Sequence, residues 1–309
     1  MVETHKYTRL GGRYIARFGI ALLVCIGVAA LVVAVLLFRK SSSLLRTTVV
    51  LVGDPVVVWS QDRATKRVVR ITLPKDAVVE GVHGYGMYAL ESLWSLGAID
   101  RKDGEVLVRS IEEALGIPIQ WFIGKKEEGK VTLGLSSLFE YLRGGYRTNL
   151  SLPEFIALVM DSSGMRADKI TDVTITPDTA LTSEQIADGS TRQVLDTSRV
   201  DVLLGTLFED ERIRKESLSV AVYNTTDMST LGSRVARTLG HLGVFVVRVG
   251  NAAPEIGDCT VTANKDVLTT LTVAVIREVF ACKDVEGAVD VADIEVRLGS
   301  AYQARFLPQ

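Results

Sequence analysis

An uninterrupted apolar stretch over residues 18–38 is the strongest feature of the hydropathy pattern. It contains no charged residue and no proline. A helix rises about 1.5 Å per residue, so a run of this length crosses the roughly 30 Å hydrocarbon core of a bilayer and satisfies its own backbone polar groups. We therefore expect a single membrane-spanning helix at 18–38, preceded by a short N-terminal segment at 1–17.

A buried core helix and a cleaved signal peptide are the two alternatives to an anchor. The stretch exceeds the roughly 7–15 apolar residues of a signal peptide, and Arg39 and Lys40 stand where a small-residue cleavage site is expected. Before the stretch, only Glu3 opposes several basic residues, namely Lys6, Arg9, Arg13 and Arg17. Because Lys and Arg near a membrane tend to stay in the cytoplasm, we expect a cytoplasmic N-terminus and extracytoplasmic domains after residue 39.

Short apolar runs and amphipathic segments then alternate up to about residue 209. The pattern predicts strands at 47–53, 56–60, 67–73, 117–124 and 170–179. Helical spacing predicts helices at 88–96, 104–115 and 135–142, and another that Ser151 caps. Residues 182–209 are polar at first and helical later, and the charge-rich segment 210–217 suggests a linker. The first extracytoplasmic domain is therefore expected at 47–209, with an α/β fold.

The last part of the chain has a more regular order of elements. Strands are predicted at 218–226, 244–252, 259–264 and 293–299, and helices at 230–243 and 266–280. This βαββαβ order predicts a two-layer sandwich in which two helices cover one face of a sheet, forming a second domain at 218–309.

Composition and charge exclude several classes of function. The formal net charge is -2 and there is no basic block, which argues against nucleic-acid binding. The histidines, His5, His83 and His241, lie far apart, and no Cys/His spacing indicates a metal site. Outside the apolar stretch, Cys259 begins a predicted strand and Cys282 follows a predicted helix. A disulfide and two buried free thiols both remain open for this pair.

The C-terminal unit resembles the C-terminal domain of LytR-type cell-envelope proteins. The resemblance rests on a strand leading to an Asn-Thr turn at 223–226, a helix with small residues at Gly232 and Ala236, and a strand that ends in VGNA at 249–252. In that family the domain is a companion module without an assigned catalytic role.

Residues 48–124 resemble the first half of a LytR-CpsA-Psr domain. That family has a strand opening with Asp, a hairpin and a Ser-Ile-Pro-Arg-Asp-Thr motif. Here Asp54 begins the corresponding stretch, and the motif reads TLPKDA, with Lys75 in place of Arg and Asp76 retained. The resemblance implies transfer of a wall glycopolymer from a polyprenyl pyrophosphate carrier, with arginines on the phosphates and carboxylates assisting Mg²⁺.

The chain also departs from that pattern. The Gly-x-Asp-x-Arg loop expected before Asp54 is absent, and a lysine offers a point charge in place of the planar guanidinium fork. Beyond residue 124, where the family has an arginine-rich helix, only Arg143 and Arg147 occur. The phosphate clamp is therefore expected to be incomplete.

Two groups of residues are candidates for a site. Asp54, Lys75 and Asp76 form either a remnant anion or metal site, or a plain turn at the strand ends. Four arginines form either a basic pocket that binds phosphate or isolated charges on solvated faces, namely Arg101, Arg109, Arg143 and Arg147. His83 is expected to be a surface histidine, and no residue is assigned a catalytic or metal-binding role.

The leading hypothesis is a membrane-anchored envelope protein that binds wall polymer or partner proteins without catalysis and needs no cofactor. The alternative is a divergent transferase that uses Asp54, Lys75, Asp76 and Mg²⁺ on a lipid-linked phosphate. A third possibility is an envelope scaffold whose C-terminal sandwich does the binding.

Overall fold

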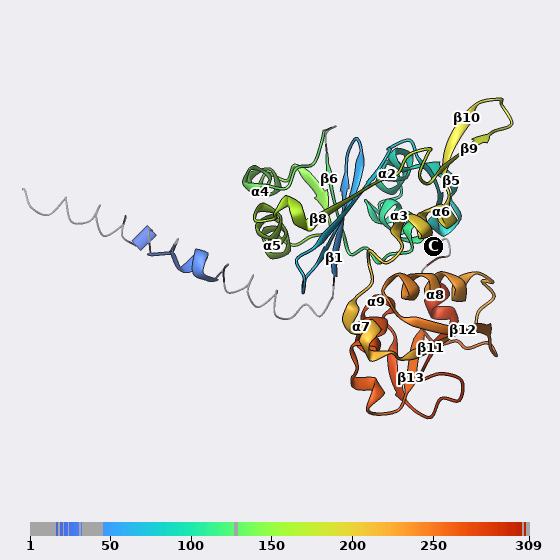
Figure 1. Cartoon of the computed structure of the whole chain (residues 1–309). Coiled ribbons are helices and arrows are strands. Elements are labelled where there is room, and N and C mark those ends of the chain that lie inside the picture. The colour runs from blue at the N-terminus through green and yellow to red at the C-terminus, as the bar shows by residue number, and fades with distance from the viewer. Residues whose placement is uncertain are drawn as a thin grey trace, which may run out of the picture.

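Three β-sheets organise the part of the chain that the structure describes (Figure 1). The structure is a computed structural model, and it describes residues 17, 19–20, 22–23, 25–30, 32, 46–126, 129–304 and 306. Two sheets belong to the first α/β unit and the third belongs to the C-terminal unit. The expected α/β class is confirmed for both units.

The first sheet has six strands in the order β7-β6-β1-β2-β3-β8. They are β1 (Arg46–Val52), β2 (Val56–Asp62), β3 (Val68–Leu73), β6 (Trp121–Lys125), β7 (Tyr146–Thr148) and β8 (Ile170–Thr174). Strand β1 is antiparallel to β2 and parallel to β6. Val49 and Val50 are both fully buried but belong to two different cores. Because successive side chains point to opposite faces, this sheet must be covered on both sides.

Helices provide that cover. On one face lie α4 (Leu135–Leu142) and α5 (Leu152–Ser163), and on the other lie α2 (Leu90–Ile99) and α3 (Glu105–Leu115) (Figure 1). Helix α5 begins after Ser151, as the sequence predicts, and Glu154 in its first turn accepts hydrogen bonds from the Ser151 N–H at 2.6 Å and the Ser151 hydroxyl at 2.7 Å.

A second sheet in the order β5-β4-β10-β9 lies beyond α3. Its strands are β4 (Val78–Gly81), β5 (Gly86–Ala89), β9 (Leu181–Gln185) and β10 (Thr191–Leu195). Short helices flank this sheet and β8, namely η1 (Val82–Gly84), η2 (Ala167–Lys169) and α6 (Thr197–Leu204). The hairpin β9–β10 occupies residues that carry no strand signal, because its polar side chains are largely solvated and lack a hydrophobic alternation.

The segment 210–217, expected to be a linker, forms a short helix, α7 (Glu211–Glu216). The Asp210 carboxylate caps it by accepting a hydrogen bond from the Arg212 N–H at 2.8 Å. Ile213 is buried in the C-terminal core, and Glu216 accepts hydrogen bonds from the first N–H groups of α9 (Leu271–Phe280). The Asp210 and Glu216 carboxylates of this segment therefore accept hydrogen bonds from N–H groups at the starts of α7 and α9.

The C-terminal sheet has five strands in the order β12-β11-β15-β13-β14. They are β11 (Ser219–Asn224), β12 (Phe245–Asn251), β13 (Cys259–Ala263), β14 (Lys283–Glu286) and β15 (Ile294–Leu298). Strand β14 is additional to the four that the sequence predicts, and all its residues are exposed. Helix α8 (Leu231–His241) and α9 share one hydrophobic core with the sheet, and η3 (Val267–Thr269) and α10 (Ser300–Gln303) complete the unit.

Cys259 and Cys282 form a disulfide, with their Cα atoms 4.3 Å apart. The bridge joins the first residue of β13 to the residue before β14. These two strands run parallel, with Thr260 opposite Lys283, so both cysteines lie at the same edge of the sheet.

The expected membrane span is described only in part. Described residues between 17 and 32 are helical, and their side chains are exposed or half-buried. No helix within the described residues is both long and apolar enough to cross a membrane. Residues 1–16 and 33–38 lie outside the described part, so the complete span at 18–38 stays a prediction.

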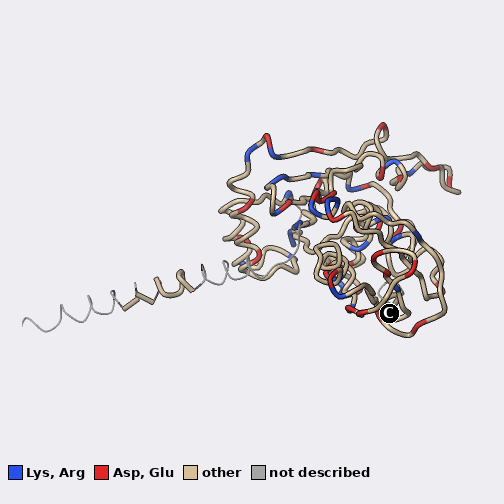
Figure 2. The backbone as a smooth tube through the Cα atoms, turned by 60° about the horizontal axis from the view of Figure 1, so that its bottom comes forward, with Lys and Arg blue, Asp and Glu red and all other residues tan. Residues whose placement is uncertain are grey.

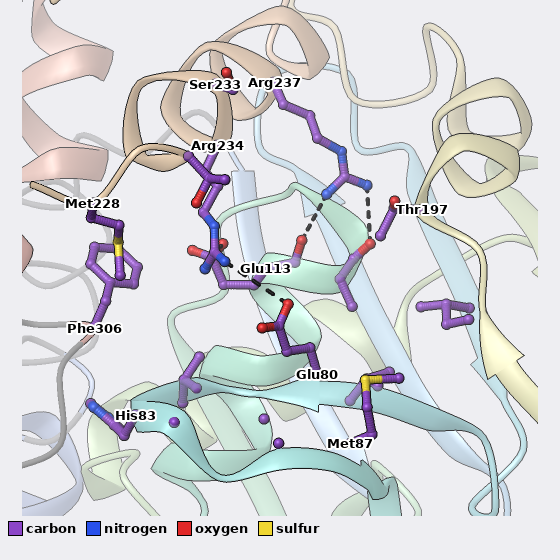
Figure 3. Close-up of a pocket in the computed structure, with 18 residues that line it drawn as sticks. Glu80, His83, Met87, Glu113, Thr197, Met228, Ser233, Arg234, Arg237 and Phe306 are labelled. Atoms are coloured by element: carbon purple, nitrogen blue, oxygen red, sulfur yellow. Dashed lines mark hydrogen bonds and ion pairs between the residues drawn. The ribbon is translucent and has the colours of Figure 1, made fainter. Parts of the chain in front are cut away.

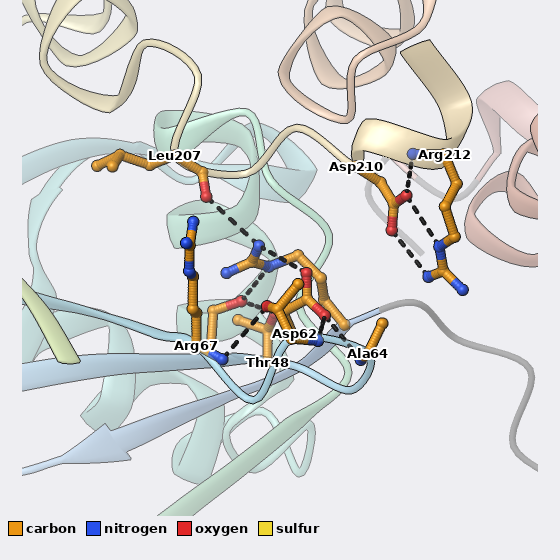
Figure 4. A network of polar contacts seen from close by, with 10 residues as sticks. Thr48, Asp62, Ala64, Arg67, Leu207, Asp210 and Arg212 are labelled. Carbon is orange, nitrogen blue, oxygen red and sulfur yellow. Dashed lines mark hydrogen bonds and ion pairs between the residues drawn. The ribbon is translucent and has the colours of Figure 1, made fainter. Parts of the chain in front are cut away.

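A buried arginine connects the start of β1 to the chain that enters the second unit, in a polar network whose Asp62 and Leu207 are labelled in Figure 4. Arg46 donates hydrogen bonds to the Ser60 hydroxyl at 3.2 Å and the Leu207 carbonyl at 3.3 Å. Its guanidinium lies 4.9 Å from the centroid of the Phe208 ring, and burial lowers its pKa. Asp62 is 3.9 Å away and balances the charge.

Candidate functional site

A groove of about 750 Å³ opens where β1 ends and α2 begins. Its apolar walls come from both elements and their neighbours, and include Val52, Val56, Leu90, Trp94, Leu96 and Ile99. Asp54, Lys75 and Glu91 stand at one side, and Lys125, Lys126 and Lys130 at another. The groove therefore combines an apolar interior with a rim of charged groups.

A tight turn places Lys75 beside Glu91. The Ala77 N–H donates to the Pro74 carbonyl at 3.1 Å, which closes the turn after β3. The Glu91 N–H donates to the Lys75 carbonyl at 3.0 Å, which joins that turn to the first residues of α2. Glu91 is thus held in the first turn of a helix, where a negative charge is favoured.

The Lys75 ammonium is paired with two carboxylates. Its Nζ lies 3.4 Å from Glu91 Oε2 and 3.7 Å from Asp54 Oδ2. The hydrogen bond to Glu91, and then the charges of Glu91 and Asp54, raise the pKa of Lys75. Asp76, the third residue of the predicted set, is exposed and does not line the groove. Asp54 therefore lies beside Lys75, and the second carboxylate beside Lys75 is that of Glu91 and not that of Asp76.

The described carboxylates do not fit a dedicated Mg²⁺ site at this rim. Mg²⁺ prefers oxygen ligands in octahedral geometry and is commonly held by one or two carboxylates together with substrate phosphates. Here Lys75 already pairs with both Asp54 and Glu91, and its single positive charge offsets one of their two negative charges. Within the described ranges, no group of three or more His, Cys, Asp or Glu side chains is arranged to hold a metal ion.

The four predicted arginines do not converge. Arg147 stacks on Trp94, with 4.2 Å from its guanidinium to the ring centroid, and its Nε is 3.3 Å from Asp103 Oδ1. Arg109 pairs with Glu112 at 2.5 Å and lines a separate cavity between the two units. Arg101 and Arg143 are exposed at the ends of α2 and α4. Of these four arginines, only Arg147 contacts a residue that lines the groove, namely Trp94, and Arg147 itself does not line the groove.

Sequence reasoning missed Glu91 and the three groove lysines. Pairing β6 with β1 in parallel would have located the lysines, because the C-terminal ends of parallel neighbouring strands meet at one edge of a sheet. Lys125 at the end of β6, and Lys126 and Lys130 after it, therefore line the same groove as Asp54. Along the described backbone, positive and negative residues are mixed (Figure 2), whereas the described residues at 125–130 that line the groove beside Asp54 include three lysines.

A second cavity of about 700 Å³ lies between the two units (Figure 3). Helix α8 faces it with Arg234 and Arg237, while Glu80 and Glu113 project from the first unit. Arg234 lies 3.3 Å from Glu113 and 3.9 Å from Glu80. Burial raises the pKa of Glu113, against the opposing charge of Arg234.

Arg237 and His241 fasten α8 to the first unit. The Arg237 guanidinium donates to the carbonyls of Glu113 and Ala114 at 2.7 and 3.0 Å, and to Asp201 Oδ1. His241 Nδ1 lies 2.9 Å from the Gly116 carbonyl oxygen. These groups already have strong partners, so the interface is a structural contact and the groove is the better candidate site.

In the comparison with protein families, residues 217–302 match LytR_C, the LytR cell envelope-related transcriptional attenuator family. Comparison with curated proteins finds no match.

Among solved structures, the chain is similar to Bacillus subtilis TagT, at 16% identity and a TM-score of 0.38 over 52% of this chain and 89% of that one. B. subtilis TagV is similar at 12% identity and a TM-score of 0.37, over 51% and 94% of the two chains. The LytR-CPS2A-psr family protein YwtF (TagT) with bound octaprenyl pyrophosphate is similar at 16% identity and a TM-score of 0.36, over 51% and 87%.

The boundaries of the family match enclose the C-terminal sheet, its disulfide and the helix that contacts the first unit. They begin at the C-terminal end of α7 and end within α10. The match falls on the unit in which the sequence resembles this family. The chain therefore carries a LytR_C domain at residues 217–302, and that resemblance is confirmed.

Proposed function

We propose that this protein is a membrane-anchored, extracytoplasmic component of cell-wall assembly that binds a wall polymer or its phosphorylated lipid carrier without catalysing transfer. The LytR_C domain supports a role in the envelope. The apolar stretch at 18–38 supports an anchor, and the basic segment before it supports a cytoplasmic N-terminus.

The observation that carries the proposal is the groove with its apolar walls and lysine rim. A phosphorylated isoprenoid needs an apolar slot for its chain and cations for its head group. Lys126 and Lys130 supply ammonium groups at the rim, together with Lys75, which also pairs with Asp54 and Glu91, and Lys125, which also pairs with Glu140. Ammonium groups bind phosphate as point charges, whereas transfer chemistry gains most from bidentate guanidinium forks and a metal ion. Binding is thus the function that these residues support best.

One observation favours a divergent transferase as the second candidate. Asp54 and Lys75 meet at the rim, where a carboxylate and a cation could act on a phosphate together. Such an enzyme would draw Mg²⁺ from the substrate complex, because Lys75 already pairs with both nearby carboxylates.

Binding and turnover can be measured on the same sample. The full chain in nanodiscs is titrated with octaprenyl pyrophosphate, and phosphate release is followed with Mg²⁺ present. We expect saturable binding that Lys75→Ala weakens by roughly tenfold, the loss of one charged hydrogen bond. Lys265→Ala removes the same charge from an exposed site in the other unit and should leave affinity unchanged.

Two results would decide against the proposal. Equal affinity in Lys75→Ala and wild type would remove the groove from consideration. Phosphate release by the wild type that disappears in Asp54→Ala would establish the transferase instead.

A further inference from the structure

Helix α4 presents an apolar row on its outer side. The side chains of Leu135, Phe139 and Leu142 are 74%, 68% and 66% exposed. They are spaced four and three residues apart and so lie on one face of the helix. An adjoining side of α4 is also apolar, since Leu138 and Tyr141 pack into the core beneath it. We call the exposed row the α4 ridge.

Basic side chains stand at the end of this ridge. Arg143 follows α4 and is exposed. Lys126, also exposed, is held next to it because its N–H donates to the Gly145 carbonyl at 3.0 Å. Lys126 is at the same time a residue of the groove rim. An apolar row with basic residues at its edge is the pattern of a helix that lies in the surface of an anionic bilayer.

The chain length before β1 brings that surface within reach. The apolar stretch ends at residue 38 and β1 begins at Arg46. Residues 39–45 span at most about 25 Å when fully extended. Helix α4 belongs to the layer next to the sheet that contains β1, and packed layers are separated by about 10 Å. The short connection therefore lets the outer side of this layer rest on the membrane.

The position of α4 also leaves the LytR_C domain clear of the bilayer. Helices α4 and α5 lie at one end of the described molecule, and the C-terminal unit lies on the other side of the first sheet (Figure 1). A membrane against α4 would meet no part of the second unit.

From these features we propose that the α4 ridge inserts into the anionic bilayer surface and holds the lysine rim of the groove at the level of the lipid head groups. The inference rests on the proposed anchoring and carrier binding. It adds the orientation of the domain and the residues that set it. Lys126, shared by the ridge edge and the rim, would then contact both the membrane lipids and the head group of the carrier.

The test uses full-length protein in vesicles of phosphatidylglycerol and phosphatidylcholine. A fluorophore is attached to a single cysteine introduced as Phe139→Cys in a Cys25→Ser background, with the disulfide kept oxidised. Lipids with bromine on the acyl chain then quench any fluorophore that enters the bilayer. The control is Val202→Cys, a position on α6 that is 84% exposed. Labelled native Cys25 reports insertion of the anchor itself.

We expect quenching at positions 25 and 139 and none at 202, with weaker quenching at 139 when phosphatidylglycerol is omitted. Replacing Leu135 and Leu142 by Asp should abolish quenching at 139 and preserve it at 25.

Quenching at 25 without quenching at 139 would overturn the inference while leaving the anchor intact. A change in fluorescence at position 139 that depends on protein concentration and not on lipid would also overturn the inference. It would show that a second copy of the chain covers the ridge. Octaprenyl pyrophosphate binding is measured separately, as above, so its outcome does not depend on the quenching results.

Discussion

Arg237 of the LytR_C domain donates a hydrogen bond from Nε to Asp201 Oδ1 of α6 at 2.7 Å, across the boundary between the two units. The same guanidinium satisfies two carbonyls at the C-terminal end of α3. Helix C-termini leave carbonyl groups without partners, and a cation is favoured there. Gly116 closes α3 by donating its N–H to the Glu112 carbonyl, and the second unit supplies the donors for the next two carbonyls.

Arg237→Ala should therefore destabilise the protein by about 2–4 kcal/mol, because it leaves two carbonyls and the Asp201 carboxylate without their donor. Urea unfolding measures the loss, and hydrogen exchange should increase in α3 and α8. Arg277→Ala, which removes an exposed ion pair with Asp284, should cost less than about 1 kcal/mol. Equal effects of the two substitutions would contradict the capping role.

Glu113 predicts a pH dependence of stability. Burial raises its pKa in the folded protein, so the folded state keeps a proton that the unfolded chain releases above about pH 4.3. The folded state binds more protons in this range, and stability must fall as pH rises from the ordinary value through the raised one. Relative to Glu113→Gln, which cannot ionise, the wild type should lose free energy of unfolding as pH rises from about 4 towards 7.

Urea unfolding of both proteins across this range measures that difference. Burial also raises the pKa of Glu112, and the charge of Glu112 adds to the raised pKa of Glu113, so the difference between the two proteins includes this coupling. Glu184→Gln on the exposed β9 controls for the loss of one negative charge. If the free energy of unfolding of the wild type, relative to Glu113→Gln, stayed constant or increased as pH rises, the predicted direction of the pH dependence would be wrong.

Loss of the disulfide should destabilise the LytR_C domain. Cys259 and Cys282 are separated by 23 positions, and closing a loop of this size is worth about 2–4 kcal/mol. Replacing both by serine should lower the free energy of unfolding by that amount, whereas Cys25→Ser should not change it. Mass mapping without reductant checks the bridge first, and two free thiols in the wild type would refute the prediction.

Gly124 is expected to tolerate no side chain. A Cβ at this position would lie 2.4 Å from Trp94 Cζ2, and Trp94 lines the groove. Gly124→Ala should therefore cost about 1–3 kcal/mol through overpacking and weaken ligand binding in the groove. Gly240→Ala within α8 meets no atom within 4 Å and should instead be stabilising by up to about 1 kcal/mol. Thermal unfolding and ligand titration of both variants separate the two effects, and unchanged stability in Gly124→Ala would contradict the packing argument.

Local patterns predicted most elements of the fold because the residues that specify them are neighbours in sequence. The valines of β1 to β3 alternate between two cores, and Ser151 with Glu154 marks the start of α5. Prediction failed at β9–β10 and at α7. The hairpin has no hydrophobic alternation, and the charges of α7 conceal one buried residue, Ile213. In both places tertiary contacts outweigh a weak local signal.

By itself, the sequence determined the apolar stretch at 18–38, the α/β class, the LytR_C resemblance and the presence of Asp54 and Lys75 at two strand ends. Only the tertiary structure decided which groups stand beside them. It brought Glu91 to Lys75 through the turn before α2, and the lysines after β6 to the end of β1. It also carried Arg237 to the end of α3. Such contacts join residues far apart in the chain, and their geometry follows from strand order and helix packing, which no local pattern encodes.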